Sequence, residues 1–204
     1  MGSCCENSCV AEGLMAQQRG TLVKVLWINA LMFIAIVAAA FYGQSTALLS
    51  DSLDNFGDAV TYAISLYVVS RGAKAKAKAA LFKGALIFIA ACFVIGQVIY
   101  KLFNPVVPVY EVMGLFSLAG LLANGLCLLL LWRHRHEDIN MSSVFECSRN
   151  DIASNLSVLF AAAAVWFFES GYPDIIIASL LAVLLLRSSY RVVSSALSEL
   201  KATI

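Results

Sequence analysis

Six stretches of this sequence are apolar and long enough to cross a lipid bilayer as a helix, which takes about 20 residues. They cover about residues 21–43, 46–70, 79–103, 109–132, 142–168 and 172–197. Stretches such as "LIFIAACFVIGQVIY" are apolar on every side, unlike a surface helix of a soluble protein. The composition agrees, with 61% hydrophobic and only 13% charged residues. The sequence therefore predicts an all-α integral membrane protein with six transmembrane helices.

Little of the chain lies outside these stretches. Residues 1–19 form a tail that contains cysteines, and residues 20–204 form one membrane domain. Lysine and arginine gather after the second and fourth stretches and near both ends of the chain, as in "RGAKAKAK". Positive residues that flank membrane helices stay on the cytoplasmic side. We therefore expect both termini to be cytoplasmic and the chain to lie among the lipids of a plasma membrane, such as the bacterial inner membrane. The net charge of +1 gives no sign of a nucleic-acid partner.

Three aspartates interrupt the second stretch in the segment "DSLDNFGD". On a helix Asp51, Asp54 and Asp58 fall within an arc of about 60°, with Asn55 beside them. A charged side chain in the middle of a bilayer costs about 2.5–3.5 kcal/mol on insertion scales. Such a stripe is therefore expected to face a cavity, a cation or a proton path. The alternative is a protonated aspartate that bonds a neighbouring helix, and Asp51, nearest the outer end, fits that alternative best.

A comparable interruption, "FECSRNDIASN", lies in the fifth stretch. Cys147 and Asp151 are spaced i, i+4, as are Asp54 and Asp58. The second and fifth helices are the middle members of two three-helix halves, which is the pattern of an inverted 3+3 repeat with its site at the shared interface. Two facing pairs would supply three carboxylates and one thiol. That set suits a tetrahedral cation such as Zn²⁺, and the sulfur favours Zn²⁺ or Cd²⁺ over Mg²⁺ or Ca²⁺.

On these two motifs the sequence resembles the cation diffusion facilitator family, of the zinc, cadmium and cobalt efflux type. The segments "LLSDSLDNFGDAVTYAISLYVV" and "SVFECSRNDIASNLSVLF" carry the resemblance. It implies a homodimeric antiporter that exports divalent metal ions, Zn²⁺ or Cd²⁺, by alternating access in exchange for protons. Residues 20–204 would be its transport domain, with the transported ion in place of any cofactor. The transport site that the resemblance implies consists of Asp54, Asp58, Cys147 and Asp151.

The sequence departs from the family pattern in three places. Many members have histidine where this chain has Cys147, and others have histidine in place of Asp54, so the preferred metal stays open. Members usually continue into a cytoplasmic metal-binding domain after the sixth helix, whereas this sequence stops at Ile204. We therefore expect a short form that lacks that domain.

Several other side chains could assist the site, either as accessory metal ligands or as hydrogen-bonding partners of the ligands. The accessory metal candidates are Cys4, Cys5 and Cys9 of the tail, His134 and His136 of the loop after the fourth helix, and Asp51. The candidate partners are Asn55 and Asn155. Each has a simpler interpretation, as an incidental tail cysteine, a solvated loop residue or a polar contact between helices.

Two other functions compete with metal export. One is an uptake carrier that passes soft ions such as Hg²⁺ along a relay of thiols from Cys4 and Cys5 to Cys147. The other is a membrane sensor that binds metal without transporting it. A thiol relay has no use for the aspartates, whereas an exchanger needs groups that swap protons for metal. The sequence contains no nucleophile paired with a base and no phosphate-binding loop, so we do not expect an enzyme.

Overall fold

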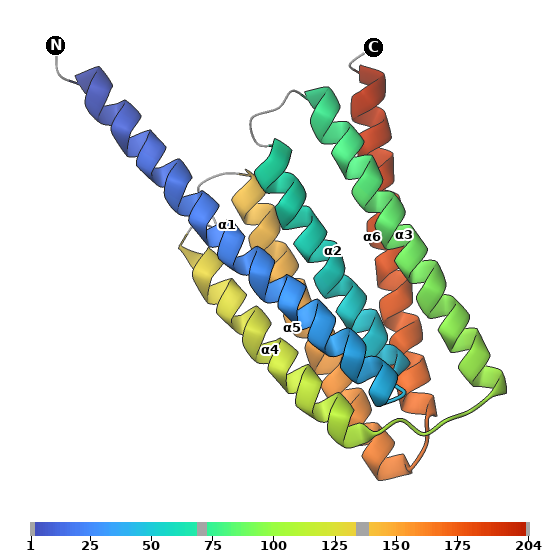
Figure 1. Ribbon diagram of the computed structural model, residues 1–204. Helices are drawn as coiled ribbons and strands as arrows, with labels where there is room; N and C mark the ends of the chain where they lie inside the picture. Colours follow the sequence, from blue (N-terminus) through green and yellow to red (C-terminus); the bar gives the residue numbers. More distant parts are fainter. Residues whose placement is uncertain (1–2, 69–72, 134–138, 203–204) are drawn as a thin grey trace.

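The computed structural model describes residues 3–68, 73–133 and 139–202, and within them the side chains of residues 19–64, 66–67, 77–78, 80–133, 145, 148–198 and 200–201. The helices are α1 (Ser3–Tyr42), α2 (Thr46–Val68), α3 (Ala73–Phe103), α4 (Tyr110–Trp132), α5 (Ile139–Phe168) and α6 (Tyr172–Ala202). They alternate in direction, and both chain termini lie at the same end of the bundle (Figure 1). The described residues form no strand, so the predicted all-α fold is confirmed.

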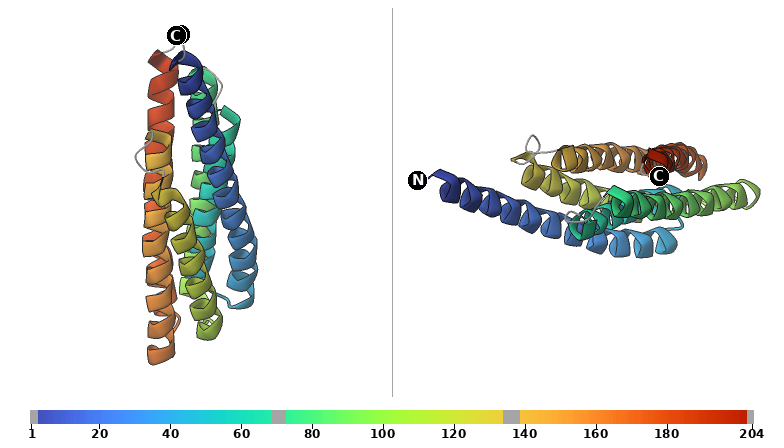
Figure 2. Two further views of the ribbon diagram at one scale, coloured as in Figure 1. Left: turned by 90° about the vertical axis from the view of Figure 1, so that its left-hand side faces the viewer. Right: turned by 90° about the horizontal axis from the view of Figure 1, so that it is seen from above.

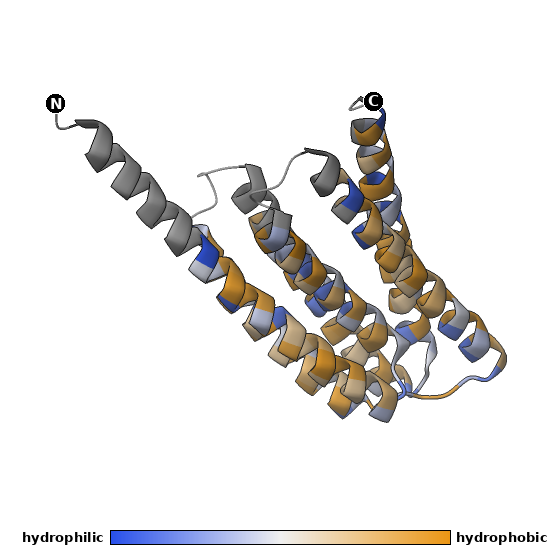
Figure 3. Cartoon of the chain, turned by 45° about the horizontal axis from the view of Figure 1, so that its top comes forward, coloured by the Kyte–Doolittle hydropathy of each residue, from blue (hydrophilic) through white to orange (hydrophobic). Residues whose placement is uncertain are grey.

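Five of these helices contain an apolar stretch long enough to cross a membrane. The stretches are Arg19–Tyr42, Ala80–Phe103, Tyr110–Trp132, Ser148–Phe168 and Tyr172–Ser198. α2 differs because Asp51, Asp54 and Asp58 all lie within its 23 residues. Apolar residues colour most of the bundle in Figure 3, and large side chains such as Leu122 and Leu129 are 67% and 73% exposed. An apolar exposed surface of this kind faces lipid, so the chain is an integral membrane protein.

Several helices extend beyond the predicted ends. α1 begins at Ser3 rather than near residue 21, α3 begins at Ala73 rather than near 79, and α6 ends at Ala202 rather than near 197. Hydropathy detects the part of a helix that contacts lipid, whereas backbone hydrogen bonding can continue past the membrane surface. The predicted apolar stretches lie close to the spans Arg19–Tyr42, Ala80–Phe103 and Tyr172–Ser198, and the helices continue past them, so that most of residues 1–19 is helical.

α2 contacts each of the other five helices. The most extensive contacts join α1 to α2, α4 to α5 and α3 to α6 (Figures 1 and 2). α3 and α6 approach closely at Gly84, whose carbonyl oxygen accepts a hydrogen bond of 2.8 Å from Ser189 Oγ. A Cβ atom at Gly84 would lie 2.5 Å from Val193 Cγ2, so this approach depends on the missing side chain.

The interior of the bundle is apolar at two levels and polar between them. One apolar cluster contains Leu22, Val25, Tyr62, Cys127 and Leu131, with Phe145 packed against it. The other lies nearer the opposite end and includes Ile36, Leu48, Met113, Val158 and Ala161. Between the two levels, α1, α2, α4 and α5 bury polar side chains that include Asn29, Asp51, Asn55, Asp58, Asn124, Ser148, Asp151 and Asn155. We call this the polar layer.

A buried carboxylate joins three helices at the end of the bundle opposite the termini. Asp174 Oδ1 accepts hydrogen bonds from Ser45 Oγ at 2.6 Å and from the Ala47 backbone N–H at 3.0 Å. Asp174 Oδ2 accepts the Thr46 N–H at 2.9 Å and forms an ion pair with Lys101 Nζ at 3.1 Å. The start of α6, the start of α2 and the end of α3 are thereby held together, which fixes the position of α2.

Candidate metal site

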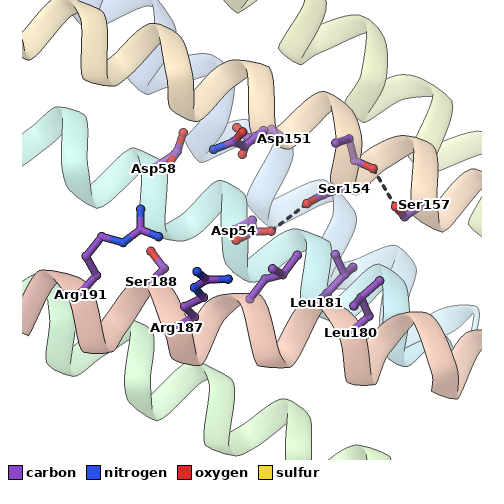
Figure 4. Close-up of a pocket in the computed structure, with 13 residues that line it drawn as sticks. Asp54, Asp58, Asp151, Ser154, Ser157, Leu180, Leu181, Arg187, Ser188 and Arg191 are labelled. Atoms are coloured by element: carbon purple, nitrogen blue, oxygen red, sulfur yellow. Dashed lines mark hydrogen bonds between the residues drawn. The ribbon is translucent and has the colours of Figure 1, made fainter.

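Three of the predicted site residues line one cavity. Asp54 and Asp58 of α2 and Asp151 of α5 border a space of about 480 Å³ between α2, α5 and α6 (Figure 4). The i, i+4 spacing on α2 places both of its aspartates on the side that faces this space. The aspartates of the two segments therefore border one cavity from α2 and from α5.

Local hydrogen bonds orient two of the three carboxylates. Tyr62, one turn after Asp58 on α2, donates its hydroxyl to Asp58 Oδ2 at 2.7 Å. Ser154 of α5 donates to Asp54 Oδ2 at 3.2 Å and so joins the two helices across the cavity. Asp151 is buried, and its Oδ2 atom has no hydrogen-bond partner. A carboxylate oxygen without a donor inside a membrane bundle calls for a proton or a cation.

The described carboxylates do not make a complete coordination shell. Among the described side chains, no group of three His, Cys, Asp or Glu residues lies close enough to hold one metal ion. The predicted fourth ligand, Cys147, lies on α5 one turn before Asp151, but its side chain is outside the described part. The four-ligand site therefore remains a prediction.

Asp51, Asn55 and Asn155 do not line the cavity. Asp51 is 1% exposed and does not line it, and both of its carboxylate oxygens lack a partner. The amide of Asn155 donates to the backbone oxygen of Asp151 at 2.7 Å, and that of Asn55 to the backbone oxygen of Asp51 at 3.0 Å. The Asn155 N–H group thus bonds a carbonyl of its own helix, and its role as a partner of the site carboxylates stays a prediction.

The remaining accessory candidates cannot be placed. The side chains of Cys4, Cys5 and Cys9, and the whole of His134 and His136, lie outside the described residues.

Two arginines of α6 line the same cavity. In the sequence they served only as part of the positive charge near the C-terminus that indicates which side of the membrane is cytoplasmic. Arg187 and Arg191 project toward it from the side opposite α5 (Figure 4). Neither forms an ion pair with a described carboxylate. Their i, i+4 spacing was the signal in the sequence, but the sequence does not say which helix faces α2. The cavity wall therefore carries positive as well as negative groups.

A helical membrane bundle with a carboxylate-lined cavity in its interior belongs to the class of membrane proteins built to admit cations. Residues 22–201 match the cation efflux transmembrane domain. The chain belongs to this family, as its two motifs had indicated.

Two curated relatives are similar to it. One is the "Cadmium, cobalt and zinc/H(+)-K(+) antiporter" of Bacillus subtilis (strain 168), which is 25% identical over 195 residues that cover 87% of this chain and 61% of the relative. The other is the "Zinc transporter ZitB" of Yersinia pestis, 27% identical over 129 residues that cover 60% of this chain and 39% of the relative. The chain thus spans less than two thirds of the length of each.

Proposed function

We propose that this chain exports divalent transition-metal ions, Zn²⁺ or Cd²⁺, from the cytoplasm in exchange for protons. The observation that carries the proposal is the meeting of Asp54, Asp58 and Asp151 at one cavity between α2, α5 and α6. The names of the two relatives support metal transport, and one of them names proton antiport. Neither name supports the thiol relay, which we do not carry further.

The proposed ligands are Asp54, Asp58, Asp151 and Cys147. If all four groups were ionised, the site would carry a charge of −4 against the +2 of the metal. Ligands must lose protons to bind metal, and closely spaced like charges hold protons when no metal is present. Entry of a metal ion would therefore release protons, and the return of protons would release the metal. This exchange is the physical basis that we propose for antiport.

The membrane arrangement belongs to the same proposal. We take α2 as the sixth transmembrane helix, because it contacts the five apolar helices and would leave the membrane only by breaking those contacts. The main contacts suit two related halves, since α1 pairs with α2 as α4 pairs with α5, and α3 pairs with α6. Both termini would be cytoplasmic, with residues 1–19 as the tail, residues 20–204 as the transport domain, and a homodimer as the assembly.

Transport by purified protein in proteoliposomes tests the proposal. We expect Asp54→Asn, Asp58→Asn and Asp151→Asn each to lower the initial rate of Zn²⁺ transport at least tenfold, because each removes the negative charge and the exchangeable proton of a ligand while keeping its shape. Glu111→Gln is the matched control, since Glu111 is an exposed carboxylate in the first turn of α4. An imposed proton gradient should accelerate the wild type.

Two results would contradict the proposal. One is near wild-type transport by any two of the three aspartate variants. The other is a rate that does not respond to the proton gradient, which would remove the antiport while leaving metal transport in place.

A further inference from the structure

A second group of buried oxygen atoms lies in the polar layer, outside the cavity described above. It consists of Asp51 and Asn55 on α2, Asn124 on α4 and Asn155 on α5, and we call it the amide cluster. Each of the four residues is 1% exposed, and none lines the cavity. Apolar clusters built from the same helices lie above and below the layer. The amide cluster is therefore sealed from water at both levels by apolar side chains.

The packing places Asp51 and Asn155 at nearly the same depth. Ser154 of α5 bonds Asp54 of α2 at 3.2 Å, and the two helices run in opposite directions (Figure 1). Asp51 lies three residues from Asp54 toward the end opposite the termini, which is about 4.5 Å along the helix axis. Asn155 follows Ser154 in that same direction by one residue, or about 1.5 Å. Their depths therefore differ by about 3 Å.

α4 closes the cluster. A Cβ atom at Gly120 would lie 2.0 Å from Asn155 Oδ1, so this oxygen rests against the α4 backbone where a side chain is missing. Asn124 is one turn further along α4 on the same buried face. The helix contacts thus bring α2, α4 and α5 together around the amide cluster.

Five of the six unpartnered atoms of this cluster are acceptors, and the sixth is the donor Nδ2 of Asn124. Both carboxylate oxygens of Asp51 and the Oδ1 atoms of Asn55, Asn124 and Asn155 have no hydrogen-bond partner. The N–H groups of Asn55 and Asn155 are already used by backbone carbonyls of their own helices. Five buried oxygens without donors would carry a large desolvation cost unless hydrogen-bond donors or a cation lie among them.

The chemistry of these atoms selects the ligand. They are hard oxygen ligands, with no sulfur or imidazole among them. Such a set disfavours the binding of zinc and cadmium. They carry one formal negative charge, which balances a monovalent ion rather than a divalent one. A proton on Asp51 supplies one O–H donor and the Asn124 amide supplies N–H donors, but a cation would contact several of these oxygens at once. We propose that Asp51, Asn55, Asn124 and Asn155 bind an alkali metal cation, at a site separate from the transition-metal site.

Thermal unfolding of the full chain in detergent tests this without any transport measurement. A ligand that binds the folded state raises the unfolding temperature. We expect NaCl or KCl to raise it by several degrees relative to choline chloride at equal ionic strength. Asp51→Asn should abolish that rise, because it removes the charge with little change in shape. Asp54→Asn is the matched control, since it alters the metal cavity and should keep the rise.

A second pair of variants guards against misfolding of the Asp51 variant. Gly120→Ala should weaken the alkali effect by displacing the Asn155 amide, whereas Gly114→Ala, with open space around its Cβ position, should not. Equal unfolding temperatures of the wild type in alkali and choline salts would overturn the proposal. An alkali effect that survives both Asp51→Asn and Gly120→Ala would also overturn it. Stabilisation by Zn²⁺ that survives Asp51→Asn would show that the transition-metal site does not depend on the amide cluster.

Discussion

Replacement of Asp174 by alanine should destabilise the bundle strongly. The first N–H groups of a helix have no partner within the helix. At the start of α2, the Thr46 and Ala47 N–H groups donate to Asp174 of α6. The Leu48 N–H group donates to the N-cap hydroxyl of Ser45 at 3.0 Å. The same carboxylate neutralises the buried Lys101 ammonium, which also donates to the backbone oxygen of Gln44. Asp174→Ala therefore leaves the Thr46 and Ala47 N–H groups without their acceptor and the buried Lys101 ammonium without its counter-charge.

The size of the effect follows from these contacts. Breaking a buried ion pair by removing one partner costs about 3–5 kcal/mol, because the remaining charge is left without compensation. Lys101 is 7% exposed and Asp174 is fully buried, so solvent does little to screen the loss. On the scale of soluble domains of about 150–250 residues, this corresponds to a fall in unfolding temperature of about 6–20 °C. Adding Lys101→Met should recover part of the loss, since the unpaired charge disappears.

Thermal unfolding in detergent, followed by the loss of monodisperse protein on gel filtration, measures this loss. Glu169→Gln is the control, because it removes an exposed carboxylate from the connection between α5 and α6, at the same end of the bundle. The reasoning would be refuted if Asp174→Ala unfolded at the temperature of this control. It would also be refuted if the double variant with Lys101→Met lost more stability than the two single variants lose in total.

Two further outcomes follow from the helix contacts and the cavity wall. Gly84→Leu should lower the unfolding temperature by forcing α3 and α6 apart, whereas Gly96→Leu on α3, with nothing within 4 Å of its Cβ position, should not. Arg187→Gln and Arg191→Gln should each lower the KM for Zn²⁺ by roughly two- to tenfold, because positive charge in the cavity repels a cation. The KM difference should shrink as salt is added, since partly exposed charges are screened.

The sequence by itself determined the all-α fold and which membrane helices carry buried carboxylates. Apolar length identifies a membrane helix because lipid offers no partner for a free backbone group, so the signal is local. That Asp54 and Asp58 share one face of their helix follows from the helical period alone. The resemblance that these motifs carried is confirmed by the family match over residues 22–201.

Only the tertiary structure decided which side chains meet. Asp51 and Asp58 share one face of α2, yet Asp58 borders the cavity and Asp51 does not. The two residues are seven positions apart, which is about 10.5 Å along the helix and enough to move a side chain to a level with different neighbours. The pairing of Lys101 with Asp174, and the arginines opposite the aspartates, likewise join segments far apart in the chain. Helical period fixes the face of a residue on its own helix, whereas the packing of all six helices decides what that face touches.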